Sequence, residues 1–215
     1  MKFSVLGLAV LSALVVPAFA DNHDSDWTFR IGAAHVSPND DSGSVLGDDG
    51  VAVDSSTGLG FSFEYAINNR WGFEVLAALP FAHDIKGTGD LSGLSIGEVK
   101  HLPPTFSALY YLNDEKTFHL GFGLNYTTFV DDKTSNALTT TLGATSTDLE
   151  LDDSFGFALK AGFDLPISDE WSFNGNLYYL DISTDADVIV DGNVATTVDV
   201  DINPWVVMVG VSTQF

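Results

Sequence analysis

The chain has 215 residues and no cysteine, so it can form neither a disulfide nor a thiolate metal site. Thirty acidic residues against eight basic ones give a formal net charge of −22. This charge excludes nucleic acid as a partner, because phosphate binding needs a basic surface. Sixteen Phe, six Tyr and four Trp are many for this length, and such residues form the two aromatic girdles of membrane β-barrels.

The first twenty residues have the pattern of a secretory signal peptide. Lys2 is followed by an apolar run over residues 3–16 and by the small-x-small sequence Ala18-Phe19-Ala20. We expect residues 1–20 to be removed and residues 21–215 to form a single domain. No later run approaches the ~20 apolar residues that a membrane helix needs.

Eight later segments alternate in polarity with the period of two that places successive side chains on opposite faces of a strand. In the third of them, the pattern assigns Phe81 to the outer face and Pro80 to the inner face. The last segment ends on the aromatic residue Phe215. The eight predicted strands are residues 27–36, 59–65, 71–81, 104–112, 118–127, 155–163, 171–179 and 205–215.

Short and long connections alternate strictly between these strands. The short ones contain Asn68-Asn69, residues 113–115 and residues 166–170. The sequence therefore predicts an all-β fold, an eight-stranded antiparallel transmembrane β-barrel with short periplasmic turns and long extracellular loops. Three tryptophans that begin ascending strands, Trp27, Trp71 and Trp171, would share the lower girdle. The four predicted long loops are residues 37–56, 82–100, 130–152 and 183–196, and Asp191-Gly192 in the last of these predicts a hairpin turn.

With its strands laid out, the sequence resembles the OmpW family of small outer-membrane barrels. The resemblance implies a bacterial outer-membrane protein that passes small hydrophobic molecules, with Phe215 as the signal for the barrel assembly machinery. At the inner position Tyr178 the family has a larger Trp, and the loops here are unusually acidic. The segments that carry the resemblance are Ala78-Leu79-Pro80-Phe81, His101-Leu102-Pro103-Pro104-Thr105, Gly123-Leu124-Asn125-Tyr126-Thr127-Thr128-Phe129, Asp153-Ser154-Phe155-Gly156, Tyr179-Leu180-Asp181-Ile182 and Asp201-Ile202-Asn203-Pro204-Trp205-Val206.

Charged residues are predicted on the inner face near the periplasmic end. Buried charges persist only when they are paired, so two acids and two bases would form a neutral charged floor. A stabilising role fits this set better than a catalytic one. Its members are Arg30, Glu64, Glu74 and Lys160, with His119 at the same level.

Above this floor the predicted inner face is apolar, whereas a water-filled porin lumen would be polar. Such a lining suits a small hydrophobic ligand that enters from outside. The alternative is a closed barrel whose interior is filled by its own side chains. The predicted lining comprises Leu76, Ala78, Pro80, Leu109, Tyr178, Leu180, Val206 and Met208.

Prolines mark two places where the wall could open, because proline lacks the N–H that a strand ladder needs. Pro80, Pro103 and Pro104 flank the upper ends of the third and fourth strands, and Pro38 and Pro204 flank the first and eighth. We expect a sideways exit at one of these gaps, unless the prolines merely end pairing at the rim.

The sequence thus predicts an outer-membrane channel for uptake of small hydrophobic molecules, without cofactor or metal. Catalysis is not expected, because His83, Asp84 and His101 near the outer rim form neither a Ser-His-Asp arrangement nor a metal site with a third ligand. The alternative is a structural barrel, or a surface receptor whose loops serve a phage or bacteriocin.

The acidic loops have two interpretations, a solvated acidic surface or divalent ions that bridge to lipopolysaccharide phosphates. Asp48-Asp49-Gly50 lacks the ligand spacing of a calcium loop, which favours the solvated surface. In either case outer-membrane lipid and lipopolysaccharide are the expected surroundings.

Overall fold

The computed structural model describes residues 26–39, 41–42, 44–46 and 49–215. The predicted signal peptide, residues 1–20, lies outside this range. The described chain is almost entirely strand, with one short helix, α1 (Asn136–Thr141), and one 3-10 turn, η3 (Gly89–Leu91). Neither helical segment of the described chain has the length and apolar character needed to cross a membrane.

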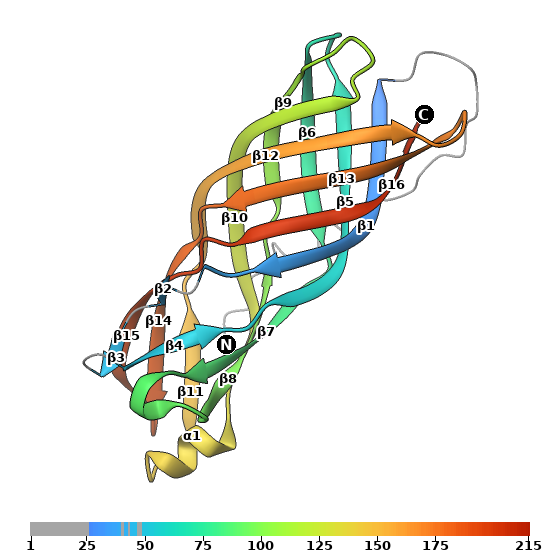
Figure 1. Ribbon diagram of the computed structural model, residues 1–215. Helices are drawn as coiled ribbons and strands as arrows, with labels where there is room; N and C mark the ends of the chain where they lie inside the picture. The colour runs from blue at the N-terminus through green and yellow to red at the C-terminus, as the bar shows by residue number, and fades with distance from the viewer. Residues whose placement is uncertain (1–25, 40, 43, 47–48) are drawn as a thin grey trace.

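Eight strands close into an antiparallel barrel, which confirms the predicted fold (Figure 1). Each strand pairs with the next, β10 also pairs with β12, and β16 returns to pair with β1. Closure matters because lipid offers no hydrogen-bond partner to a free strand edge. The barrel strands are β1 (Trp27–Ser37), β5 (Ser56–Ala66), β6 (Trp71–Ala78), β9 (Thr105–Tyr111), β10 (Phe118–Thr134), β12 (Ser154–Pro166), β13 (Trp171–Leu180) and β16 (Trp205–Gln214).

Large apolar side chains cover the outside of the barrel. Phe122 is 61% exposed, a fraction that suits lipid rather than water. At the end with the short turns, the exposed rings of Trp27 and Tyr65 lie 4.9 Å apart and those of Trp71 and Tyr110 lie 5.0 Å apart. These rings form the aromatic girdle expected at that end.

The long connections, predicted as loops, contain strands of their own. At the end of the barrel opposite the short turns they build an outer extension, in which some strands continue the barrel sheet and others form a separate four-stranded sheet (Figure 1). In the sequence, Asp, Gly and Ser interrupt short apolar alternations. Because of these interruptions, the strand pattern is hard to recognise. The extension comprises β2 (Asp41–Ser42), β3 (Ser44–Leu46), β4 (Asp49–Val53), β7 (Phe81–Gly87), β8 (Ser95–Leu102), β11 (Thr147–Leu151), β14 (Ser183–Val190), β15 (Asn193–Asp201) and the upper part of β10.

The hairpin predicted at Asp191-Gly192 is present. It joins β14 to β15, and both residues have positive φ, 50° and 80°. A two-residue turn with both φ values positive matches the right-handed twist of the strands that it joins.

The alternation of inward and outward side chains changes its register between β6 and β7. β6 ends at Ala78, β7 begins at Phe81, and Phe81 is 3% exposed while Pro80 is exposed. The predicted assignment of Phe81 outward and Pro80 inward was therefore wrong. A slip of one residue in a strand moves all later side chains to the opposite face, and the break at Leu79-Pro80 produces this slip.

The barrel orientation can be tested by labelling single cysteines, since the native chain has none. Ala195→Cys lies on the exposed outer hairpin and Asp169→Cys on an exposed short turn. A membrane-impermeant maleimide should label the first in intact cells and the second only after permeabilisation. Labelling of Asp169→Cys in intact cells would contradict this orientation.

Candidate functional site: a charged floor below an apolar interior

Arg30 on β1 is the centre of the charged floor. Its side chain is 2% exposed and its guanidinium lies 2.6 Å from a Glu64 oxygen, 2.7 Å from Asp164 Oδ2 and 3.4 Å from Glu74 Oε2. The planar fork of Arg suits several carboxylates at once. Glu64 and Glu74 are direct partners across β5 and β6, so they would repel without this cation.

Lys160 on β12 is the second cation and pairs with the same oxygen of Glu74. Ser62 Oγ donates to that oxygen at 3.0 Å, and the Tyr178 hydroxyl donates to the other oxygen at 3.4 Å. The Lys160 ammonium also lies 5.3 Å from the centre of the Tyr178 ring. The Glu74 carboxylate therefore joins both cations, and Tyr178 covers the network from above.

Asp164 belongs to this floor although the sequence analysis did not include it. Arg30 Nε donates to both oxygens of its carboxylate, at 3.1 and 3.2 Å. Two cations thus face three carboxylates, so the predicted neutrality of the floor was wrong. The signal was present in the sequence, because Lys160 and Asp164 are four residues apart on one strand and so share a face.

The remaining floor contacts involve neutral groups. The Tyr111 hydroxyl donates to Glu64, and His119 Nε2 lies 3.2 Å from Asn176 Oδ1. Gly162 makes room for the second pair, since a Cβ there would lie 2.3 Å from Asn176 Oδ1. Below the floor a polar cavity of about 200 Å³ opens toward the short turns, and Asp164 lies at its upper boundary.

The predicted apolar lining is brought together only in part. Leu76, Tyr178, Leu180, Val206 and Met208 are buried, and with Ala78 they line a cavity of about 10 Å³. Five residues that the sequence analysis did not assign to the lining contribute to the same cavity, namely Ala34, Gly60, Ala77, Phe81 and Pro103. We call this space the inner cavity.

Two predicted lining residues lie elsewhere. Leu109 is buried, but its position opposite Gly72 and Gly121 places it outside the inner cavity. Pro80 is exposed because of the shift between β6 and β7. Neither residue is in position to line a path above the floor.

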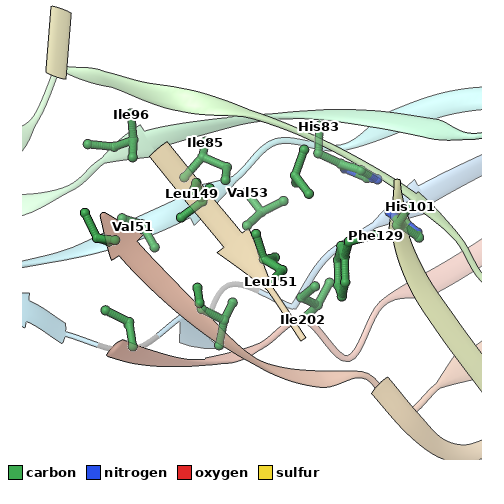
Figure 2. Close-up of a pocket in the computed structure, with 15 residues that line it drawn as sticks. Val51, Val53, His83, Ile85, Ile96, His101, Phe129, Leu149, Leu151 and Ile202 are labelled. Carbon is green, nitrogen blue, oxygen red and sulfur yellow. The ribbon is translucent and has the colours of Figure 1, made fainter. Parts of the chain in front are cut away.

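A larger apolar cavity, the outer pocket, lies in the outer extension and has a volume of about 60 Å³ (Figure 2). The sequence analysis missed it, because its walls are strands that were predicted as polar loops. Alternations such as Val198, Val200 and Ile202 were the available signal. The pocket is lined by Val51, Val53, His83, Ile85, Ile96, Val99, His101, Phe129, Leu149, Leu151, Ala186, Val188, Val198, Val200 and Ile202.

Aromatic rings lie between the two cavities. His101 lines the outer pocket, and its ring centre is 5.9 Å from that of Phe81, which lines the inner cavity. The centre of the Phe129 ring lies 6.2 Å from that of the His101 ring. Apolar and aromatic side chains therefore connect the outer pocket to the space above the floor.

The strand ladder is interrupted at one of the two predicted proline gaps. β6 and β9 pair as far as Leu76 and Thr105, and β7 and β8 resume at Phe81 and His101. Residues 77–80 and 102–104 form no ladder pair with each other. Pro80, Pro103 and Pro104 all lie within this interruption.

The second predicted gap, at Pro38 and Pro204, was wrong. The ladder between β1 and β16 runs without a break to Ser37 and Trp205. Beyond it, Asn39 N donates to the Ile202 carbonyl at 2.8 Å, and on the other side of β16 Leu180 N of β13 donates to the Pro204 carbonyl at 3.1 Å. Proline lacks only the N–H, and here its carbonyl still serves the neighbouring strand.

His83 and His101 are the titratable groups of the outer pocket. Their rings stack with centres 4.9 Å apart and planes 23° apart. Within the described residues no three His, Asp or Glu side chains converge as metal ligands. Asp84, next to His83, points to the exposed face of β7.

A closed eight-stranded barrel with a lipid-facing exterior and an aromatic girdle defines a small outer-membrane β-barrel protein. More specifically, the chain belongs to the OmpW family, whose family model matches residues 23–215. The protein is therefore located in the bacterial outer membrane.

Individual relatives agree with this assignment. The chain is 43% identical to outer membrane protein W of Vibrio cholerae, over 100% of both chains. Among solved structures it is similar to OprG of Pseudomonas aeruginosa, with 34% identity, a TM-score of 0.79 and coverage of 89% of this chain and 96% of that one. It is also similar to the Escherichia coli outer membrane protein W, with 33% identity, a TM-score of 0.59 and coverage of 91% and 100%.

The floor makes a prediction about stability. Lys160→Ala leaves Glu74 short of a buried partner and should lower the free energy of unfolding by ~3 kcal/mol or more. Adding Glu74→Ala should recover part of this loss, because the unpaired charge is removed. Urea unfolding of the refolded barrel measures both values.

The matched control is Lys86→Ala, which removes an exposed ion pair with Asp54 and should leave stability nearly unchanged. Strict additivity of the Lys160→Ala and Glu74→Ala effects would show that these two residues do not stabilise each other.

Proposed function

We propose that this barrel takes up small hydrophobic molecules from outside and releases them sideways into the membrane. The observation that carries the proposal is a single cluster of buried apolar side chains. It extends from Ile85, Ile96 and Val99 around the outer pocket to Tyr178 and Met208 above the charged floor. A lining of this kind favours apolar ligands.

The charged floor argues against passage straight through the barrel. An apolar molecule gains ~0.8 kcal/mol for each CH₂ that leaves water, so a chain of about eight carbons would forfeit ~6 kcal/mol in a hydrated, charged layer. It would also have to displace buried ion pairs of Arg30 and Lys160, which are costly to break. A sideways exit above the floor avoids both costs.

The interruption of the ladder at residues 77–80 and 102–104 supports a place for that exit. Ala77 and Ala78 lie beside the inner cavity, and their small side chains leave the wall thin there. Because few backbone hydrogen bonds join these two stretches, separating them would cost less than opening a paired region of the wall.

One observation favours the alternative, a closed structural or receptor barrel. The inner cavity of about 10 Å³ is at the lower limit for one water molecule, which needs roughly 10–15 Å³. Uptake therefore requires side chains such as Phe81 to move. Measured transport separates the two functions.

Leu76→Asp and Met208→Asp should each reduce uptake of a fluorescent apolar dye by about tenfold or more, since a charge inside the apolar path repels the ligand. Uptake is measured in cells, and heat-dependent gel mobility reports barrel assembly. Val194→Asp, on the exposed outer hairpin, is the control and should leave uptake unchanged. Normal uptake by assembled Leu76→Asp and Met208→Asp barrels would favour the closed barrel.

The exit makes a separate prediction. Ala77→Phe adds bulk at the interrupted ladder and should slow release of the dye into the membrane several-fold. Ala161→Phe adds the same bulk on the exposed outer face of β12 and should have little effect. Equal rates for the two variants in reconstituted vesicles would place the exit elsewhere.

A further inference from the structure

The outer pocket contains one buried hydrogen-bonding atom that the proposed uptake of purely apolar molecules does not use. His83 is 2% exposed, and its Nε2 atom has no hydrogen-bond partner within the described chain. Apart from His101, the side chains around it are hydrocarbon. Figure 2 shows His83, His101 and Phe129 at one end of the pocket, and Val51 and Ile96 at the other.

The tautomer of His83 follows from its other ring nitrogen. Nδ1 lies 2.6 Å from the backbone carbonyl oxygen of Asp54, and a carbonyl oxygen can only accept. Nδ1 therefore carries the hydrogen. A neutral imidazole has a single N–H, so Nε2 presents a lone pair and acts as an acceptor.

The ring is neutral under ordinary conditions. Burial among apolar side chains lowers the pKa of His83, and this effect outweighs the opposite influence of the Asp54 carbonyl and of the Asp54 and Asp84 carboxylates. A protonated ring would donate from both nitrogens and attract an anion. The neutral ring instead requires a donor at Nε2.

The stacked neighbour does not supply that donor. The His101 ring is nearly parallel to the His83 ring, with their centres 4.9 Å apart. Because an imidazole N–H points in the plane of its own ring, it cannot be directed at the lone pair of a stacked partner. His101 thus holds the ring in place and leaves Nε2 to an occupant of the pocket.

We propose that His83 makes the outer pocket selective for apolar molecules that carry a hydroxyl group, such as aliphatic alcohols and phenols. This inference rests on the proposed entry of hydrophobic molecules through the same pocket. Alkanes would leave Nε2 unpaired, while ethers, ketones and carboxylates would place an acceptor against its lone pair.

The size of the pocket limits what it holds. Its volume of about 60 Å³ is well below the roughly 150 Å³ that encloses a benzene molecule. It would therefore contain the hydroxyl end of a longer molecule and a few carbons, with the remainder outside.

The test compares 1-octanol with heptyl methyl ether, which has the same atoms but no O–H donor. Binding to the full-length barrel in lipid nanodiscs is measured at equal mole fractions in the lipid. We expect octanol to bind about tenfold more tightly, the value of one good hydrogen bond. Octanol should also shift the ¹⁵N resonance of His83 Nε2, and the ether should not.

The variant His83→Phe keeps an aromatic ring in the stack and removes the acceptor. It should abolish the preference while changing the affinity for the ether less than twofold. His101→Phe is the matched control, and should keep the preference because Nε2 of His83 remains.

The outcomes distinguish the proposed role of His83 from the proposed hydrophobic uptake on which it rests. Equal affinity of the native barrel for the two probes would overturn the role of His83 and leave hydrophobic entry intact. An unchanged preference in His83→Phe would overturn the role of His83 as well. Failure of both probes to bind would overturn entry through the outer pocket itself.

Discussion

The ladder between β1 and β16 is the constraint on which the rest of the structure depends. It runs from Thr28 and Gln214 to Ser37 and Trp205, and Phe215 N donates to the Trp27 carbonyl at 3.1 Å beyond its lower end. In lipid a strand edge has no other partner, so the chain must close on itself. Closure then fixes which side chains face inward. The interior of an eight-stranded barrel is just wide enough to be filled by these side chains or to hold one small ligand.

As a result, the barrel interior is divided into a charged layer and an apolar region. Arg30 and Lys160 can be buried only because Glu64, Glu74 and Asp164 surround them. Above Tyr178 a cluster of buried apolar side chains continues into the outer extension. The fold thus places a charged layer directly below an apolar region. The proposed sideways release follows from this order and requires a weak place in the wall.

The outer extension is the part of the molecule where sequence and structure differ most. Short alternations around Val51, Ile96 and Val198 were concealed by Asp, Gly and Ser. Their strands are stable only because they continue barrel strands or pair with one another. The pocket between them is lined by apolar side chains and contains the unpaired nitrogen of His83. The segments that were predicted as loops therefore bear most directly on the proposed uptake and on its selectivity.

The sequence by itself determined the number of barrel strands, the closure of the barrel, the alternation of its inner and outer faces and most of the charged floor, because these depend on a local period of two. Asp164 was equally available from that period and was overlooked. Tertiary structure decided the shift of face at Leu79-Pro80, since a one-residue slip leaves no local trace. It also decided which proline gap keeps its strand pairing, because the β1–β16 ladder runs to Ser37 and Trp205 and Asn39 N finds a distant acceptor in the Ile202 carbonyl beyond it. Contacts between segments far apart in the chain cannot be obtained from periodicity.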